Sequence, residues 1–132
     1  MIVRILVLLF GLYLGVGHQQ LKAQDVFSVD SLKTVFQAGE YETVINEGLE
    51  SLRQWDRHDT ISKDYAEILR TISRAYIQVD AFNDAFKINQ RALDVFLALN
   101  DSLGAAQTYS NFAGIKFYLE DSAKAFEYLN RV

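Results

Sequence analysis

Apolar residues recur at steps of three and four through most of the chain, most clearly in the stretch 61–99. Its first half carries one apolar stripe: Ile61, Tyr65, Ile68, Leu69, Ile72, Tyr76 and Val79. Asp80 interrupts this pattern, and a second stripe follows at the same period: Ala85, Ala92, Leu93 and Phe96. Because side chains at this spacing share one face of an α-helix, the stretch predicts two helices that fold back on each other.

Two more helix pairs are predicted, one before this stretch and one after it. The first pair breaks at Gly39, because glycine takes a left-handed conformation at little steric cost. Its second helix contains Gly48, which we expect at a close helix crossing. Asn100 also tolerates a left-handed backbone and separates the second pair from the third. The predicted pairs cover about 28–55, 60–99 and 102–132.

The pattern has a measurable period. The position just after each predicted turn is Val44, then Ala85, then Ala125, at spacings of 41 and 40 residues. Asp59 or Thr60 is the expected N-cap of the helix that begins near residue 60. The chain stops about three turns into the last predicted helix, which leaves open whether that helix is truncated.

One unit of this repeat resembles the tetratricopeptide family. The matching residues are a small residue and an aromatic on the first helix, an aromatic after the turn and two alanines seven apart: Ser73, Tyr76, Phe82, Ala85 and Ala92. The period exceeds the ~34 residues of the simplest unit, and it resembles the extended, exported bacterial members. The resemblance covers about 28–132. It implies an all-α fold, a right-handed α-solenoid of three antiparallel helix hairpins.

The first 23 residues have the composition of a secretory signal peptide. Arg4 precedes an apolar run at 5–16, and small and polar residues lead to Ala23, the expected cleavage point. The run is well short of the ~20 apolar residues that a membrane-spanning helix needs. The sequence therefore predicts export to the periplasm or the extracellular space. An uncleaved membrane anchor remains the alternative, and only then would the protein contact a membrane.

Cleavage would make the chain more acidic. Of 13 basic residues, Arg4 and Lys22 would be lost, which leaves 11 against 17 acidic residues and a net charge of −6. A surface of that sign repels a phosphate backbone, so we expect no nucleic-acid binding.

Catalytic chemistry lacks its usual residues. After residue 23 the chain has one histidine, His58, and no cysteine, so metal clusters and histidine-based nucleophile relays lack their components. Asp80 and Asp84 lie at a predicted turn, where helix capping explains them better than acid–base catalysis. There is no glycine-rich phosphate loop. We therefore expect no enzyme, no catalytic residue, no metal and no cofactor.

The resemblance implies a groove lined by the first helix of each hairpin. The side chains expected to point into it are Lys33, Gln37, Glu67, Arg70, Arg74, Gln78, Gln107, Ser110, Gly114 and Tyr118. Lys33, Arg70 and Arg74 would form a basic strip suited to an acidic segment or a C-terminal carboxylate of a partner. The alternative is that Arg70 pairs with Glu67 one turn away, while Lys33 and Arg74 are merely solvated.

These features predict an exported scaffold that binds a protein or peptide. The second interpretation is a truncated extracytoplasmic sensory region of a bacterial signalling protein, either a sensor kinase or a transcription regulator. The family resemblance implies this role, because exported repeat arrays of this kind often form the sensory part of such proteins. Phe117 and Leu129 are expected to face inward in the last pair. No polar capping helix follows, so the outer edge of that pair should favour self-association or further repeats.

Overall fold

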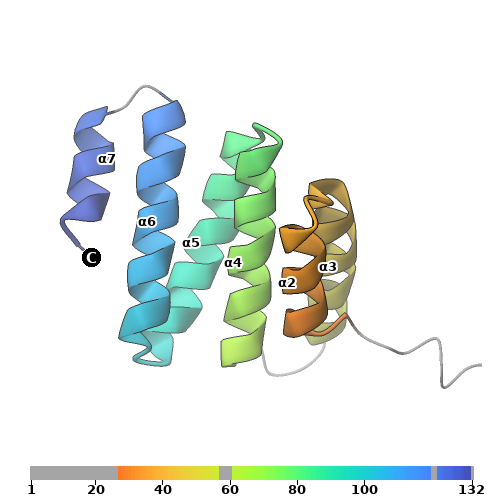
Figure 1. Ribbon diagram of the computed structural model, residues 1–132. Helices are drawn as coiled ribbons and strands as arrows, with labels where there is room; N and C mark the ends of the chain where they lie inside the picture. The colour runs from red at the N-terminus through yellow and green to blue at the C-terminus, as the bar shows by residue number, and fades with distance from the viewer. Residues whose placement is uncertain (1–26, 57–60, 120–121, 132) are drawn as a thin grey trace, which may run out of the picture.

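A computed structural model describes residues 27–56, 61–119 and 122–131 (Figure 1). All regular secondary structure within these ranges is α-helical: α2 (Val29–Gln37), α3 (Tyr41–Trp55), α4 (Lys63–Gln78), α5 (Phe82–Ala98), α6 (Ser102–Tyr118) and α7 (Ser122–Leu129). The expected signal peptide, His58, Glu120 and Asp121 lie outside the described residues. None of the described helices is both long and apolar enough to span a bilayer.

Left-handed residues end three of the helices. Gly39 (φ 79°), Asp80 (φ 59°) and Asn100 (φ 54°) follow α2, α4 and α5. After α4, the Ala81 amide donates to the Tyr76 carbonyl at 2.9 Å, so a backbone hydrogen bond closes the helix end. The predicted breaks at Gly39, Asp80 and Asn100 are confirmed.

Side-chain caps begin several helices. The Ser28 hydroxyl accepts a hydrogen bond from the Ser31 amide at 3.1 Å, and a carboxylate oxygen of Asp101 accepts one from the Gly104 amide at 2.9 Å. The Ser62 hydroxyl caps α4 by accepting from the Tyr65 amide at 3.1 Å. The expected cap at Asp59 or Thr60 is therefore wrong, because α4 begins at Lys63 and its N-cap is Ser62.

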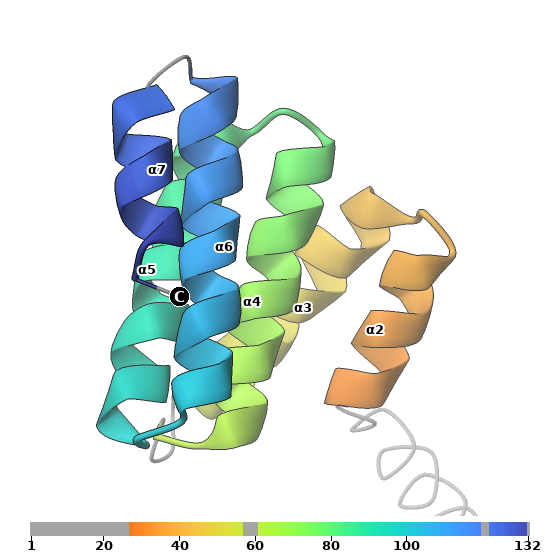
Figure 2. The ribbon, with the colours of Figure 1, turned by 60° about the vertical axis from the view of Figure 1, so that its left-hand side comes forward.

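Consecutive helices pack side by side, and α4 lies at the centre of the molecule (Figures 1 and 2). It contacts α2, α3, α5 and α6, and nine of its 16 residues are buried. The helices α2, α4 and α6 follow one another across one face, which we call the first-helix face, while α3 and α5 pack behind them. The apolar core therefore lies between these two layers, with Leu32, Ile72, Phe96 and Phe112 fully buried.

Glycine permits a close helix crossing at position 48. A Cβ atom at position 48 would lie 2.6 Å from the Cγ1 atom of Ile72 and 3.2 Å from a methyl carbon of Leu32. Real carbon atoms do not approach this closely, so α3 could not lie against α2 and α4 as it does with any larger residue here. The expectation of a close crossing at Gly48 is confirmed.

Three predicted inward positions are instead exposed: Ile61 (58%), Phe117 (69%) and Leu129 (49%). Ile61 precedes the first residue of α4, so the helical period that placed it on the stripe does not apply. Phe117 lies five residues after the buried Phe112, a separation that places it on a different side of α6. The apolar stripe of α6 therefore ends before Phe117.

Candidate functional site

The candidate groove residues lie on the three helices of the first-helix face. Lys33 and Gln37 are on α2, Gln107, Ser110, Gly114 and Tyr118 are on α6, and the remaining candidates, Glu67, Arg70, Arg74 and Gln78, are on α4. The structure brings Lys33 close to the α4 candidates. Two of the α6 candidates have contacts elsewhere: Ser110 bonds to its own helix, and Tyr118 stacks on Phe82 with 5.1 Å between ring centroids.

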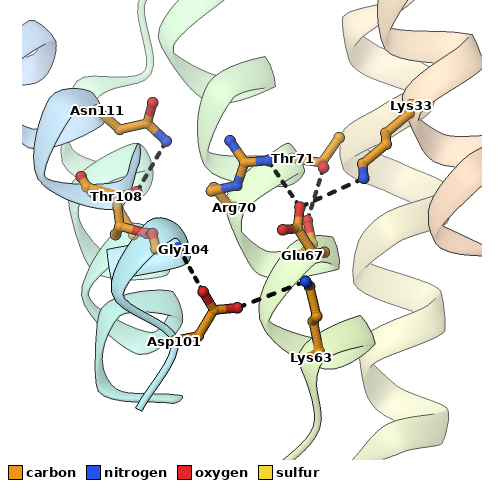
Figure 3. A network of polar contacts seen from close by, with 10 residues as sticks. Lys33, Lys63, Glu67, Arg70, Thr71, Asp101, Gly104, Thr108 and Asn111 are labelled. Carbon is orange, nitrogen blue, oxygen red and sulfur yellow. Dashed lines mark hydrogen bonds and ion pairs between the residues drawn. The ribbon is translucent and has the colours of Figure 1, made fainter. Parts of the chain in front are cut away.

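Glu67 is the centre of a small ion network (Figure 3). Its carboxylate accepts a hydrogen bond from Arg70 at 2.8 Å and lies 3.7 Å from the Lys33 ammonium. The side chains of Glu67 and Arg70 are only 11% and 13% exposed, so water screens this pair weakly. The alternative expectation for Arg70, an ion pair with Glu67, is thus the arrangement found, and Lys33 shares the same carboxylate.

Arg70 is not fully satisfied by this pairing. Its Nε atom is buried and has no hydrogen-bond partner among the described residues. An arginine offers five N–H donors in a rigid plane, and a buried donor without an acceptor costs about 1–3 kcal/mol. The Arg70 guanidinium is therefore only partly paired by Glu67.

Arg74, one turn further along α4, carries a charge without a carboxylate partner. Its guanidinium carbon lies 4.2 Å from the centroid of the Phe36 ring, a cation–π contact. Within the described ranges no hydrogen bond or ion pair to Arg74 is found. Burial lowers the pKa of Arg74, and the nearby charge of Arg70 lowers it further, while Glu67 and Tyr41 act in the opposite direction.

A pocket of about 270 Å³ opens beside Arg74. Its lining comes from α2, the start of α3 and α4: Lys33, Phe36, Gln37, Tyr41, Thr71 and Arg74. The rings of Phe36 and Tyr41 meet edge to face at 5.2 Å on either side of the Gly39 turn. The pocket thus combines an aromatic wall with two cations, and no residue that lines it is acidic.

Sequence reasoning found half of this lining. Lys33, Gln37 and Arg74 are among the groove candidates, whereas the helical spacing of the first predicted pair places Phe36 and Tyr41 on inward, core-facing stripes. Thr71 received no role; its hydroxyl donates to the Glu67 carbonyl at 2.8 Å. The available signal was the position of the two aromatics, immediately before and after a glycine turn, where a ring can remain half-buried.

A second polar cluster joins α5 to the first-helix face. The side-chain amide of Asn89, which is fully buried, donates to the backbone carbonyl of Thr108 at 2.9 Å. The amide of Asn111 donates in turn to the Asn89 side-chain oxygen at 3.2 Å. Asn111 shares one side of α6 with Gln107, Gly114 and Tyr118, and sequence reasoning missed it because Ser110 was chosen instead.

The metal-ligating side chains of the described residues do not gather into one place. No group of three or more histidine, cysteine, aspartate or glutamate side chains in these ranges could hold a metal ion. Asp80 is the left-handed residue after α4, and Asp84 lies in the first turn of α5; both are exposed.

No protein-family model, curated protein or solved structure matches this chain.

Proposed function

We propose that this chain is a tetratricopeptide-like α-solenoid of three hairpins that binds a segment of another polypeptide on its first-helix face. Two observations support the repeat assignment. Gly39 and Asp80 are left-handed residues 41 positions apart, close to the spacing of the sequence pattern. Ser73 and Ala85 are both fully buried, and the Ser73 hydroxyl donates to the Ala85 carbonyl at 3.0 Å, so small residues allow α4 and α5 to approach closely.

The observation that carries the binding proposal is Arg74 beside the pocket. The whole chain has a net charge of −4, yet Lys33, Arg70 and Arg74 lie near a single carboxylate, Glu67. Glu67 already contacts Lys33 and Arg70. A partly buried guanidinium without an acidic partner is a favourable contact for an acidic group on a bound chain.

Affinity capture with matched charge variants tests this function. The bait is the chain from residue 24, and the source is the extracytoplasmic fraction of the producing cell. We expect Arg74→Glu to lose the proteins that the wild-type bait enriches, because the substitution places a carboxylate where the partner's acidic group would lie. Lys87→Glu makes the same charge change at an exposed position of α5 and should retain them. Retention by both variants would rule out binding through the first-helix face.

Export through a cleaved signal peptide is part of the same proposal. Its support is the sequence pattern at 1–23. Mass spectrometry of the cell-derived protein should give an N-terminus at Gln24. A protein that begins at Met1 and sediments with membranes would instead indicate the uncleaved anchor.

The second candidate function is the extracytoplasmic sensory region of a bacterial signalling protein. Exposed apolar residues at the α6–α7 end favour it, since an additional helix pair would cover Phe117, Leu119 and Leu129. The coding sequence downstream of residue 132 tests this alternative directly. Further repeats followed by a membrane span and an output domain would establish it, and a stop codon would exclude it.

A further inference from the structure

We infer that the pocket between α2 and α4 binds a single carboxylate carried on an apolar stem, with the carboxylate on Arg74 and the stem against Phe36 and Tyr41. This inference rests on the proposed binding function and specifies the chemical group that the first-helix face takes. It assigns a ligand class to a site defined by Lys33, Phe36, Gln37, Tyr41, Thr71 and Arg74.

The first argument is the distribution of charge. Glu67 lies within ion-pair distance of Arg70 and Lys33, at 2.8 Å and 3.7 Å. Arg74 has no such partner among the described residues, and burial together with the Arg70 charge lowers its pKa. An anion bound at Arg74 would stabilise the charged guanidinium and so raise this pKa again. The pocket therefore has one unmatched positive charge.

The second argument is the geometry of that charge. The guanidinium carbon of Arg74 lies over the Phe36 ring, 4.2 Å from the ring centroid. Stacking of this kind leaves the N–H groups at the edge of the plane free to donate. Two parallel N–H donors match the two oxygens of a carboxylate. Gln37 and Tyr41 add an amide and a hydroxyl at the pocket wall, and no hydrogen bond of either side chain is found in the described ranges.

The third argument concerns selectivity against phosphate. The Thr71 hydroxyl is already donated to the Glu67 carbonyl at 2.8 Å, so it is not available to an additional ligand oxygen. The Glu67 carboxylate also lies beside the cations of this face, so every negative charge that a ligand adds meets its repulsion, and a dianion meets about twice that of a monoanion. A monoanion with two oxygens fits this donor set better than a dianion with three.

The fourth argument is the apolar wall and the size of the pocket. Phe36 and Tyr41 are both half-buried and meet at 5.2 Å, so an aromatic surface is present before any ligand binds. The volume of about 270 Å³ is close to the lower end of small-ligand pockets, ~300 Å³. That space suits one side chain or one small aromatic acid.

Titration of the ¹⁵N-labelled chain from residue 24, followed by amide chemical shifts, tests the inference. The probes are 3-phenylpropanoate, its neutral amide and phenyl phosphate. We expect 3-phenylpropanoate to shift amides at 36–41 and 71–74 and to bind at least about tenfold more tightly than either analogue. Equal binding of the acid and its amide, or tighter binding of phenyl phosphate, would overturn the assignment.

Variants locate the site. Arg74→Gln should weaken 3-phenylpropanoate binding at least about tenfold, Arg74→Lys should retain part of it through charge alone, and Lys87→Gln should leave it unchanged. Thermal melts of each variant establish that it is folded. Undiminished binding by folded Arg74→Gln would place the ligand elsewhere and refute the inference.

A further arm identifies the source of the carboxylate. An acetylated Ala-Ala-Phe peptide with a free C-terminus is compared with the same peptide amidated at that end. Binding of the free form as tight as that of 3-phenylpropanoate would indicate a chain end, and binding of the small acid alone would indicate a free metabolite. If Arg74→Glu loses the captured partner while no carboxylate probe binds, the inference fails and the proposed function stands.

Discussion

Asn89 occupies a position of α5 that the helical pattern reserves for an apolar side chain. It lies four residues after Ala85 and three before Ala92, and all three residues are fully buried. Its amide bonds to the Thr108 carbonyl and to Asn111, so the polar group is satisfied inside the core. A buried amide with fixed partners selects one alignment of α5 against α6, which apolar contacts alone specify less sharply.

Asn89→Ala should lower the free energy of unfolding by about 1–3 kcal/mol, because it removes one buried and one partly buried hydrogen bond and leaves a void. Urea denaturation measures this change. The matched control is Asn46→Ala at an exposed position of α3, where we expect a change within about 0.5 kcal/mol. An Asn89→Ala variant as stable as the wild type would mean that these hydrogen bonds contribute nothing to stability.

Tyr65 should make stability depend on alkaline pH. Burial raises its pKa, and the hydrogen bond that its hydroxyl donates to Asp56 at 3.0 Å raises it further, while Arg91 acts in the opposite direction. The fold favours the neutral phenol, so this contribution is complete below about pH 10 and is lost as pH rises through the raised pKa. Between about pH 9 and 11, wild-type stability should fall more steeply than that of Tyr65→Phe in parallel denaturation series. Identical slopes would contradict the shift.

At the scale of the helix, three glycines differ in the space around them: Gly48 and Gly104 are in crowded positions, and Gly114 is not. Gly48 lies against Ile72 where α3 crosses α4, and a Cβ at Gly104 would overlap the ring of Phe96. Gly114, in contrast, has no atom within 4 Å of the place where its Cβ would lie. Its position in the interior of α6 thus brings the usual helix penalty of glycine without relieving any contact in the described part of the chain.

Gly114→Ala should therefore raise the free energy of unfolding by about 1 kcal/mol, the difference in helix propensity. Gly48→Ala should lower it by about 1–3 kcal/mol, since the added methyl must displace Ile72 in a packed core. Chemical denaturation of the two single variants compares them directly. Equal effects of the same sign would show that crowding at Gly48 is not what distinguishes these positions.

Helix periodicity in the sequence predicted the helices and turns more completely than it predicted the residues that line the pocket. The turns at Gly39, Asp80 and Asn100 follow from local backbone preference, which the sequence records residue by residue. The inward assignment of Phe117 failed because α6 is apolar on more than one side, so periodicity alone could not orient it. Tyr41 could not be assigned to a pocket wall because that role depends on where Arg74 of another helix lies.

The α6–α7 end of the whole molecule has a concentration of exposed apolar side chains: Phe117 (69%), Leu119 (43%) and Leu129 (49%). Terminal units of stacked helical repeats usually need a polar outer surface to remain monomeric. Because the same surface is present on every copy, a second copy of this chain is the simplest partner for it.

Light scattering should show a molar mass that rises with protein concentration. The Phe117→Ser and Leu129→Ser double variant should remain monomeric over the same range, because it reduces the apolar area available to a second copy. Leu103→Ser, which changes an equally exposed residue near the other end of α6, should behave as the wild type. A wild-type chain that stays monomeric at the highest concentration would refute self-association through this end.

The central position of α4 has a consequence for how the molecule opens. Helix α2 is nine residues long, has one buried residue, Leu32, and among the described helices contacts only α3 and α4, so we expect it to detach more easily than α4. Amides of α2 should exchange with solvent long before those of α4. A ligand held between these two helices would join the least protected segment to the most protected one. Ligand binding would thus slow amide exchange at 29–37 without requiring a change in the conformation of the protein.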